Sequence, residues 1–185
     1  DLFRDLREGK ADIVTDHIDT FTENGIRLKS GRELEADIIV TATGLNLQVL
    51  GGMELSIDGA PLDVSERMTY KGVLMEGVPN MAWIFGYTNA SWTLKADIAS
   101  AYICRLLNYM DSEGMAVVTP QGDSDLTLAD RSIMDALASG YVKRSSHKLP
   151  RQGRHHPWKV MNHYSKDKHM LLEEPVEDGL LSFSR

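Results

Sequence analysis

Residues 80–110 read NMAWIFGYTNASWTLKADIASAYICRLLNYM and predict a strand, a polar turn and a long helix in immediate succession. The strand is expected over residues 81–85, because a continuous apolar run is typical of a strand buried on both faces of a sheet. Gly86 breaks this run, and Ser91 and Thr93 are candidate N-caps for the helix. Apolar residues then recur every three or four positions, so we expect a helix buried over most of its circumference.

The turn between the predicted strand and helix, residues 86–93, is a candidate ligand-binding site. Backbone N–H groups at a helix N-terminus have no intrahelical acceptor and attract electron-rich oxygens. In open α/β sheets, ligands bind at the carboxyl ends of the strands, where this turn would lie. An ordinary connection between a strand and a helix has the same pattern, and the pattern alone favours that plainer interpretation.

Length and composition indicate a globular protein, and the succession of predicted strands and helices indicates the α/β class. The chain has 185 residues, of which 42% are hydrophobic, and a net charge of -7. Negative charge argues against bulk attraction to nucleic acid. The single cysteine, Cys104, rules out an intrachain disulfide and favours a reducing, cytoplasmic location. No apolar run reaches the ~20 residues of a membrane span.

Residues 11–43 predict a small β-meander. Two short strands are expected between Ile13 and Phe21, then a hairpin turn at residues 23–25, because Asn-Gly tolerates positive φ. A return strand over residues 26–28 leads to an interior strand within residues 34–43. That strand ends in Ala42, Thr43 and Gly44, where a glycine could let the backbone approach a neighbour closely, although a plain turn glycine explains these letters better.

The composition changes near residues 121–125, where we place a boundary between residues 1–122 and a mostly helical extension, residues 123–185. Helices are expected over residues 126–138 and 160–172, with a basic stretch between them and an acidic tail after them. The spacing of the histidines at positions 155, 156, 163 and 169 does not suit a metal site. The basic stretch is more typical of a solvated surface than of a phosphate contact.

Two segments together resemble the C-terminal part of class B flavoprotein monooxygenases. The first is residues 25–44, which end in the family's Ala-Thr-Gly sequence, and the second is residues 77–97, from Gly-Val-Pro-Asn-Met through Gly-Tyr-Thr-Asn-Ala-Ser-Trp-Thr-Leu-Lys-Ala-Asp. Residues 104–111, 140–142 and 149–153 continue the likeness, which covers most of residues 12–160. It is greatest with Baeyer–Villiger enzymes of the ethionamide-activating type.

The resemblance implies the C-terminal part of a fold with two dinucleotide-binding domains, one for FAD and one for NADP. Enzymes of this family reduce FAD with NADPH and insert an oxygen atom from O2 beside a ketone or onto sulfur or nitrogen of a small organic substrate. The likeness implies that residues on two loops and one helix lie near FAD, and that one tryptophan either lines the substrate pocket or simply packs. The FAD-binding candidates are Ala42, Thr43, Gly44, Thr88, Asn89 and Leu94, and the pocket candidate is Trp92.

Several sequence motifs that are typical of the family are absent from this chain. It contains no G-x-G-x-x-G motif, no family histidine fingerprint and no C-x-x-C. We therefore expect a fragment that is inactive alone, binds FAD weakly and associates into dimers through exposed strand edges. A fragment of a pyridine nucleotide–disulfide reductase and a non-catalytic interaction domain are the alternatives.

Overall fold

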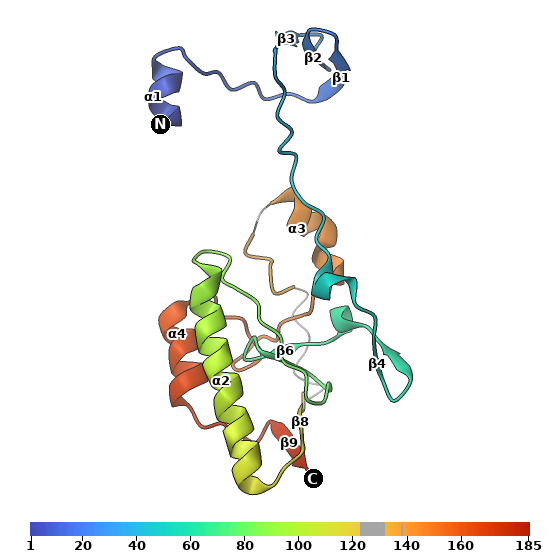
Figure 1. Cartoon of the computed structure of the whole chain (residues 1–185), viewed down its shortest axis with the longest axis vertical. Coiled ribbons are helices and arrows are strands. Elements are labelled where there is room, and N and C mark those ends of the chain that lie inside the picture. The colour runs from blue at the N-terminus through green and yellow to red at the C-terminus, as the bar shows by residue number, and fades with distance from the viewer. Residues whose placement is uncertain (123–131, 138) are drawn as a thin grey trace. The chain divides into compact units, whose positions relative to one another are not determined.

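The computed structural model describes residues 1–122, 132–137 and 139–185, and the chain divides into two compact units, Asp1–Thr43 and Gly44–Arg185 (Figure 1). The described residues combine helices with four small antiparallel sheets. This mixture is compatible with the expected α/β class. None of the helices in these ranges is both long enough and apolar enough to cross a membrane.

The smaller unit confirms the predicted meander. Its three strands pair antiparallel in the order β1-β2-β3, and a two-residue turn joins the first two. Gly25 follows that turn at φ +155, and a Cβ there would collide with the main-chain carbonyl of Leu34 on the neighbouring strand. The unit consists of α1 (Leu2–Arg7), β1 (Ile18–Thr22), β2 (Gly25–Leu28) and β3 (Glu33–Glu35).

The interior strand expected within residues 34–43 is wrong beyond Glu35. Residues 36–43 form no strand, and Ile38 and Val40 are 82% and 84% exposed. The apolar run has no neighbouring strand with which to pair among the described residues, so its side chains stay in solvent. Of the two short strands expected between Ile13 and Phe21, only β1 forms, and the other prediction is wrong because residues 11–17 are irregular.

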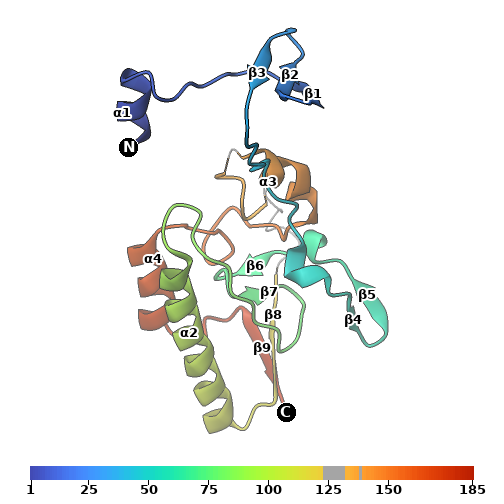
Figure 2. The same cartoon turned by 45° about the horizontal axis from the view of Figure 1, so that its top comes forward.

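The larger unit is built around one long helix and several short strands (Figure 2). The elements are η1 (Val49–Gly52), β4 (Leu55–Ile57), β5 (Ala60–Leu62), η2 (Val64–Glu66), β6 (Thr69–Tyr70), β7 (Leu74–Met75), α2 (Trp92–Glu113), β8 (Val117–Pro120), α3 (Gly140–Ser145), η3 (Ser146–Lys148), α4 (Tyr164–Lys168), the π-helical turn η4 (His169–Glu173) and β9 (Leu181–Ser184).

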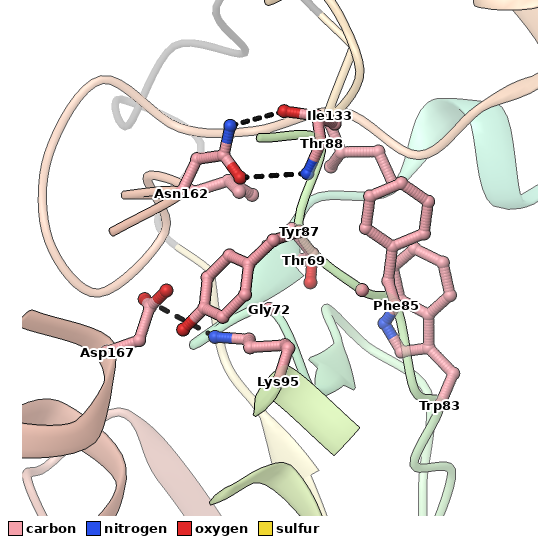
Figure 3. A pocket seen from close by; sticks show the side chains of 12 residues that line it. Thr69, Gly72, Trp83, Phe85, Tyr87, Thr88, Lys95, Ile133, Asn162 and Asp167 are labelled. Atoms are coloured by element: carbon pink, nitrogen blue, oxygen red, sulfur yellow. Dashed lines mark hydrogen bonds and ion pairs between the residues drawn. The ribbon is translucent and has the colours of Figure 1, made fainter. Parts of the chain in front are cut away.

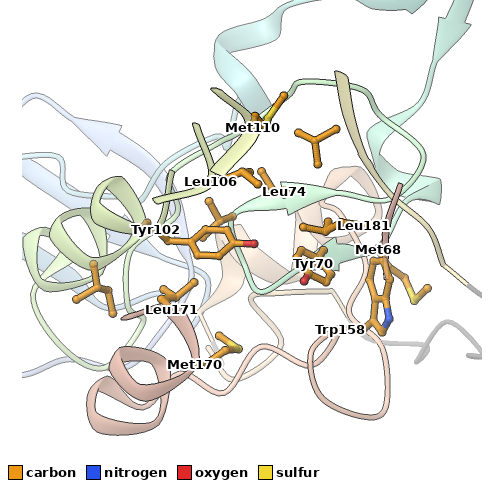
Figure 4. Packing of buried hydrophobic residues seen from close by; sticks show 14 residues of the cluster. Met68, Tyr70, Leu74, Tyr102, Leu106, Met110, Trp158, Met170, Leu171 and Leu181 are labelled. Carbon is orange, nitrogen blue, oxygen red and sulfur yellow. The ribbon is translucent and has the colours of Figure 1, made fainter. Parts of the chain in front are cut away.

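The helix α2 begins after Ser91, one of the two predicted N-caps, and its C-cap is Gly114. Gly114 adopts the left-handed conformation at φ 64, where glycine carries no steric penalty. One face of α2 packs on the aromatic and aliphatic core shown in Figure 4. The solvent-exposed face of α2 is wider than predicted, because the apolar residues Leu94 and Leu107 are 39% and 54% exposed. The buried residues of α2 are Lys95, Ile98, Ala99, Tyr102, Leu106 and Met110.

The strand predicted over residues 81–85 is replaced by an extended segment with a single backbone partner. Ala82 bridges Leu74, and the Trp83 N–H donates to the Val73 carbonyl at 2.9 Å. Ile84 is 46% exposed, so the segment is not buried on both faces. The other side of its backbone has no paired strand among the described residues, which leaves it at an edge.

Beyond residue 132, helices are shorter than predicted. Residues 132–137 form turns rather than a helix, and the rest of the helix expected over residues 126–138 lies outside the described residues. The last helix begins at Tyr164, four residues later than expected, and strand β9 was not foreseen. Because β9 pairs with β8, residues on both sides of position 122 share one sheet; the domain boundary stays a prediction.

A polar network crosses the core beside α2. The Tyr70 hydroxyl donates to Asp178 at 2.6 Å, and the buried Lys71 ammonium lies 3.3 Å from the same carboxylate. Burial raises the pKa of both Tyr70 and Tyr102, so each phenol stays protonated well into the alkaline range. The Tyr102 hydroxyl is also fully buried, yet it makes no hydrogen bond within the described ranges.

These two tyrosines form a matched pair for substitution. We expect Tyr70→Phe to lower the free energy of unfolding by about 1.5–3 kcal/mol, because it removes the hydrogen bond from the buried Tyr70 hydroxyl to the Asp178 carboxylate. Tyr102→Phe should change it by less than about 0.5 kcal/mol, since the lost hydroxyl has no partner. Urea denaturation of the chain measures both, and equal losses would contradict the assigned hydrogen bonds.

Candidate functional site

A pocket opens beside the predicted ligand turn (Figure 3). It has aromatic walls and a polar floor, and its cavity volume is about 20 Å³, which is room for about one water molecule. The pocket draws on the turn, the first helical turn of α2, strand β6 and the segment that runs into α4. Its lining residues are Thr69, Gly72, Trp83, Phe85, Gly86, Tyr87, Thr88, Lys95, Ile133, Val160, Asn162 and Asp167.

A buried ion pair forms the floor of the pocket. The Lys95 ammonium on α2 lies 3.3 Å from Oδ1 of Asp167 on α4, and the two side chains are 7% and 2% exposed. Burial lowers the pKa of Lys95, and the neighbouring carboxylate offsets part of this shift. The pair therefore joins two helices across a region from which water is largely excluded.

Three buried polar atoms of the pocket have no hydrogen-bond partner within the described residues. They are the hydroxyl of Tyr87, Oδ2 of Asp167 and the indole Nε1 of Trp83. Burial, together with the negative charge of Asp167, raises the pKa of Tyr87, so its hydroxyl keeps its proton. Two donors and one carboxylate acceptor thus line a cavity whose volume suits a single water molecule.

Asn162 fastens the turn to the segment that precedes α4. Its Oδ1 accepts from the Thr88 backbone N–H at 3.1 Å, and its Nδ2 donates to the Thr88 hydroxyl. The Asn162 carbonyl accepts from Nδ2 of Asn89 at 3.2 Å. Thr88 and Asn89, both predicted cofactor contacts, are therefore held by one residue 74 and 73 positions away in the sequence.

Trp92 and Leu94 lie on the first turn of α2. The Trp92 ring packs against Phe85 with centroids 5.3 Å apart, yet Trp92 is 55% exposed. Gly86 permits this packing, since a Cβ there would overlap the Trp92 ring. The Ser91 side chain does not cap the N-terminus of α2, because its hydroxyl bonds instead to that of Thr93 at 2.7 Å. Backbone donors and exposed apolar side chains therefore lie together at this end of α2.

The other three predicted cofactor contacts lie at the junction of the two units. Ala42 and Thr43 close the first unit and Gly44 opens the second. Gly44 has φ 100, a conformation that glycine adopts readily, and no atom of the described chain lies within 4 Å of where its Cβ would stand.

Two of the four histidines that the sequence analysis considered, His156 and His169, pair with carboxylates. His156 Nε2 lies 3.1 Å from Glu174, and His169 Nδ1 lies 2.6 Å from Glu173. The hydrogen bond to Glu173 raises the pKa of His169. No group of three or more potential metal ligands occurs within the residues that the structure describes.

Sequence reasoning missed the roles of Lys95, Asp167 and Asn162. Two of them carry a signal: Lys95 is in register with Ile98 and Tyr102 on the buried face of α2, and Asp167 is three residues before the buried Met170. A charged residue in an apolar stripe needs a partner of opposite charge. Asn162 carries no comparable local signal, because its partners are distant in sequence.

Substitutions at Lys95 and Asp167 test how much their ion pair contributes to stability. We expect Asp167→Asn or Lys95→Met to lower the free energy of unfolding of the chain by about 3–5 kcal/mol, because each leaves one buried polar partner alone. The double variant Lys95→Met/Asp167→Leu should recover part of that loss. Glu173→Gln, which alters an exposed pair, is the control and should cost less than about 1 kcal/mol. Equal losses for Asp167→Asn and Glu173→Gln in urea denaturation would contradict this assignment.

The whole chain is similar in sequence to one part of proteins named as FAD-containing monooxygenases. It is 60% identical over 184 residues to the FAD-containing monooxygenase MymA of Mycobacterium tuberculosis. It is 53% identical over 185 residues to the FAD-binding monooxygenase AlmA of Acinetobacter baylyi, and 50% identical over 186 residues to the FAD-containing monooxygenase EthA of M. tuberculosis. In each case all of the chain is covered, but only 37% of the relative.

No family model and no solved structure matches the chain. The resemblance to flavoprotein monooxygenases is nevertheless confirmed, because these identities extend over every part of the sequence. The chain is a homologue, along its entire length, of one part of the FAD-containing monooxygenases.

Proposed function

We propose that this chain is the C-terminal part of a monooxygenase that uses FAD, NADPH and O2 to insert one oxygen atom into a ketone or onto sulfur or nitrogen of a small organic substrate. The observation that carries the proposal is the 60% identity to a relative named as an FAD-containing monooxygenase. The chain spans 37% of that relative's length, so the activity belongs to a longer protein.

The geometry at the start of α2 fits FAD. When bound, FAD would supply the electron transfer and the activation of O2. Uncapped N–H groups at the helix N-terminus suit the electron-rich pyrimidine edge of the ring, and the exposed side chains of Trp92 and Leu94 suit its apolar surface. Thr88 and Asn89 would approach the ring from the preceding turn.

The remaining parts of the proposal concern assembly. Ala42, Thr43 and Gly44 would lie along FAD, in a fold with two dinucleotide-binding domains. The exposed apolar segments at residues 38–40 and at Ile84 would be covered by the rest of the enzyme. In the isolated chain they favour association with a second copy. A cytoplasmic location remains part of this proposal.

The full-length protein tests the proposed function directly. We expect it to purify with bound flavin, to oxidise NADPH with O2 and to convert a panel of ketones, sulfides and amines into oxygenated products. The 185-residue chain purified in the same way should be colourless, since it contains no phosphate-binding glycine motif. A full-length preparation that binds no flavin, or binds it without consuming O2, would overturn the proposal.

Asn89 is the residue of the turn whose loss should change the chemistry without unfolding the protein, because it is exposed. In the full-length enzyme we expect Asn89→Ala to lower the oxygenated product formed per NADPH and to raise hydrogen peroxide. The loss of one hydrogen bond to a buried partner is worth about 1–3 kcal/mol. Asn108→Ala, at an exposed position of α2, is the control. A lower melting temperature with unchanged product yield would remove Asn89 from the site.

A further inference from the structure

Asn162 makes three hydrogen bonds to two consecutive residues of the turn. Its side chain bonds both the N–H and the hydroxyl of Thr88, while its main-chain carbonyl accepts from Asn89. One asparagine therefore fixes both the backbone of the turn at Thr88 and the side-chain amide of Asn89. No other residue in the described ranges donates to or accepts from the Asn89 side chain.

The bond to Asn162 decides how Asn89 presents its amide. An asparagine amide has two N–H donors on one side and a carbonyl acceptor on the other. Because Nδ2 of Asn89 donates to Asn162, the amide is held in one of its two flipped orientations. Its Oδ1 is then the atom left to accept from a partner outside this chain.

The backbone of Asn162 supports a positioning role. Its φ is 50, in the left-handed region that asparagine tolerates better than most residues and that costs free energy for a side-chain-bearing residue. This conformation lets the carbonyl and the side chain of one residue bond to the same turn. Five residues after Asn162, Asp167 forms an ion pair with Lys95, which follows the turn in sequence. The segment that leads into α4 thus contacts the turn region at two separate points.

We propose that Asn162 is the positioning residue of the turn, and that it sets the orientation of Asn89 on which productive oxygen transfer depends. The inference rests on the proposed function, since it assumes that the turn faces FAD in the longer protein. Asn162 acts through Thr88 and Asn89 and needs no contact of its own with cofactor or substrate. Its loss should loosen the turn while α2 and the core stay folded.

Asn80 supplies a matched control for Asn162. It also has a left-handed backbone, at φ 53, and its side chain also bonds two main-chain groups, the Ala116 carbonyl at 3.0 Å and the Val118 N–H at 2.9 Å. Ala116 lies immediately before β8 and Val118 lies within it, so neither partner belongs to the turn. Glycine at either position keeps the backbone conformation and removes two side-chain hydrogen bonds, so Asn162→Gly and Asn80→Gly should destabilise the protein similarly.

The test compares the two variants in the full-length enzyme. We expect Asn162→Gly to raise the share of NADPH oxidation that ends as hydrogen peroxide by at least about threefold, while Asn80→Gly leaves it unchanged. Amide hydrogen exchange at Thr88 should become faster only in Asn162→Gly, whatever the activity. Asn162→Asp keeps the acceptor for the Thr88 N–H and should restore part of the coupling; it replaces Asn162→Gly if the latter does not fold.

Two results would overturn the inference, and they are distinguishable from each other. Equal peroxide yields in the Asn162 and Asn80 variants of a flavin-bound, oxygenating enzyme would reject the positioning role alone. A wild-type full-length protein that binds no flavin would reject the proposed function and the inference with it.

Discussion

Burial of one face of α2 is the constraint on which the larger unit depends. Ile98, Tyr102 and Leu106 pack into the core, which also contains residues from β6, β7, β8, β9 and η4 (Figure 4). Each such side chain contributes about 1.5–3 kcal/mol when it leaves water completely. Because a helix is rigid over this length, fixing its buried face also fixes the position of its N-terminal turn.

Two buried lysines form ion pairs that connect the C-terminal residues to that core. Lys71 lies 3.3 Å from Asp178, and Lys95 lies 3.3 Å from Asp167. A buried ammonium without a carboxylate is strongly unfavourable, so neither carboxylate can leave without a large loss of stability. Arg105 on α2 adds a third tie by donating to the main-chain carbonyls of Leu171 and Glu174. The residues from 160 to 180 are therefore integral to the larger unit.

Contacts with α2 and with the segment before α4 together fix the conformation of the turn at residues 86–91. Gly86 allows the Trp92 ring to pack closely on one side, and Asn162 holds Thr88 and Asn89 on the other. Positioning within about 1 Å can change the rate of a catalysed reaction by orders of magnitude. A turn held by hydrogen bonds from a well-packed segment satisfies that requirement better than a free loop.

The sequence by itself determined the elements whose hydrogen bonds and contacts are local: the helix that ends at Gly114, the meander of residues 18–35, and the resemblance to flavoprotein monooxygenases. Periodicity and turn residues encode these features within a few positions. Only the tertiary structure decided that residues 38–40 and 81–85 have too few neighbours to form interior strands. It also decided that Lys95 meets Asp167 and that Asn162 meets Thr88, 74 residues away. Such pairs depend on how helices pack, and no local pattern in the chain encodes that.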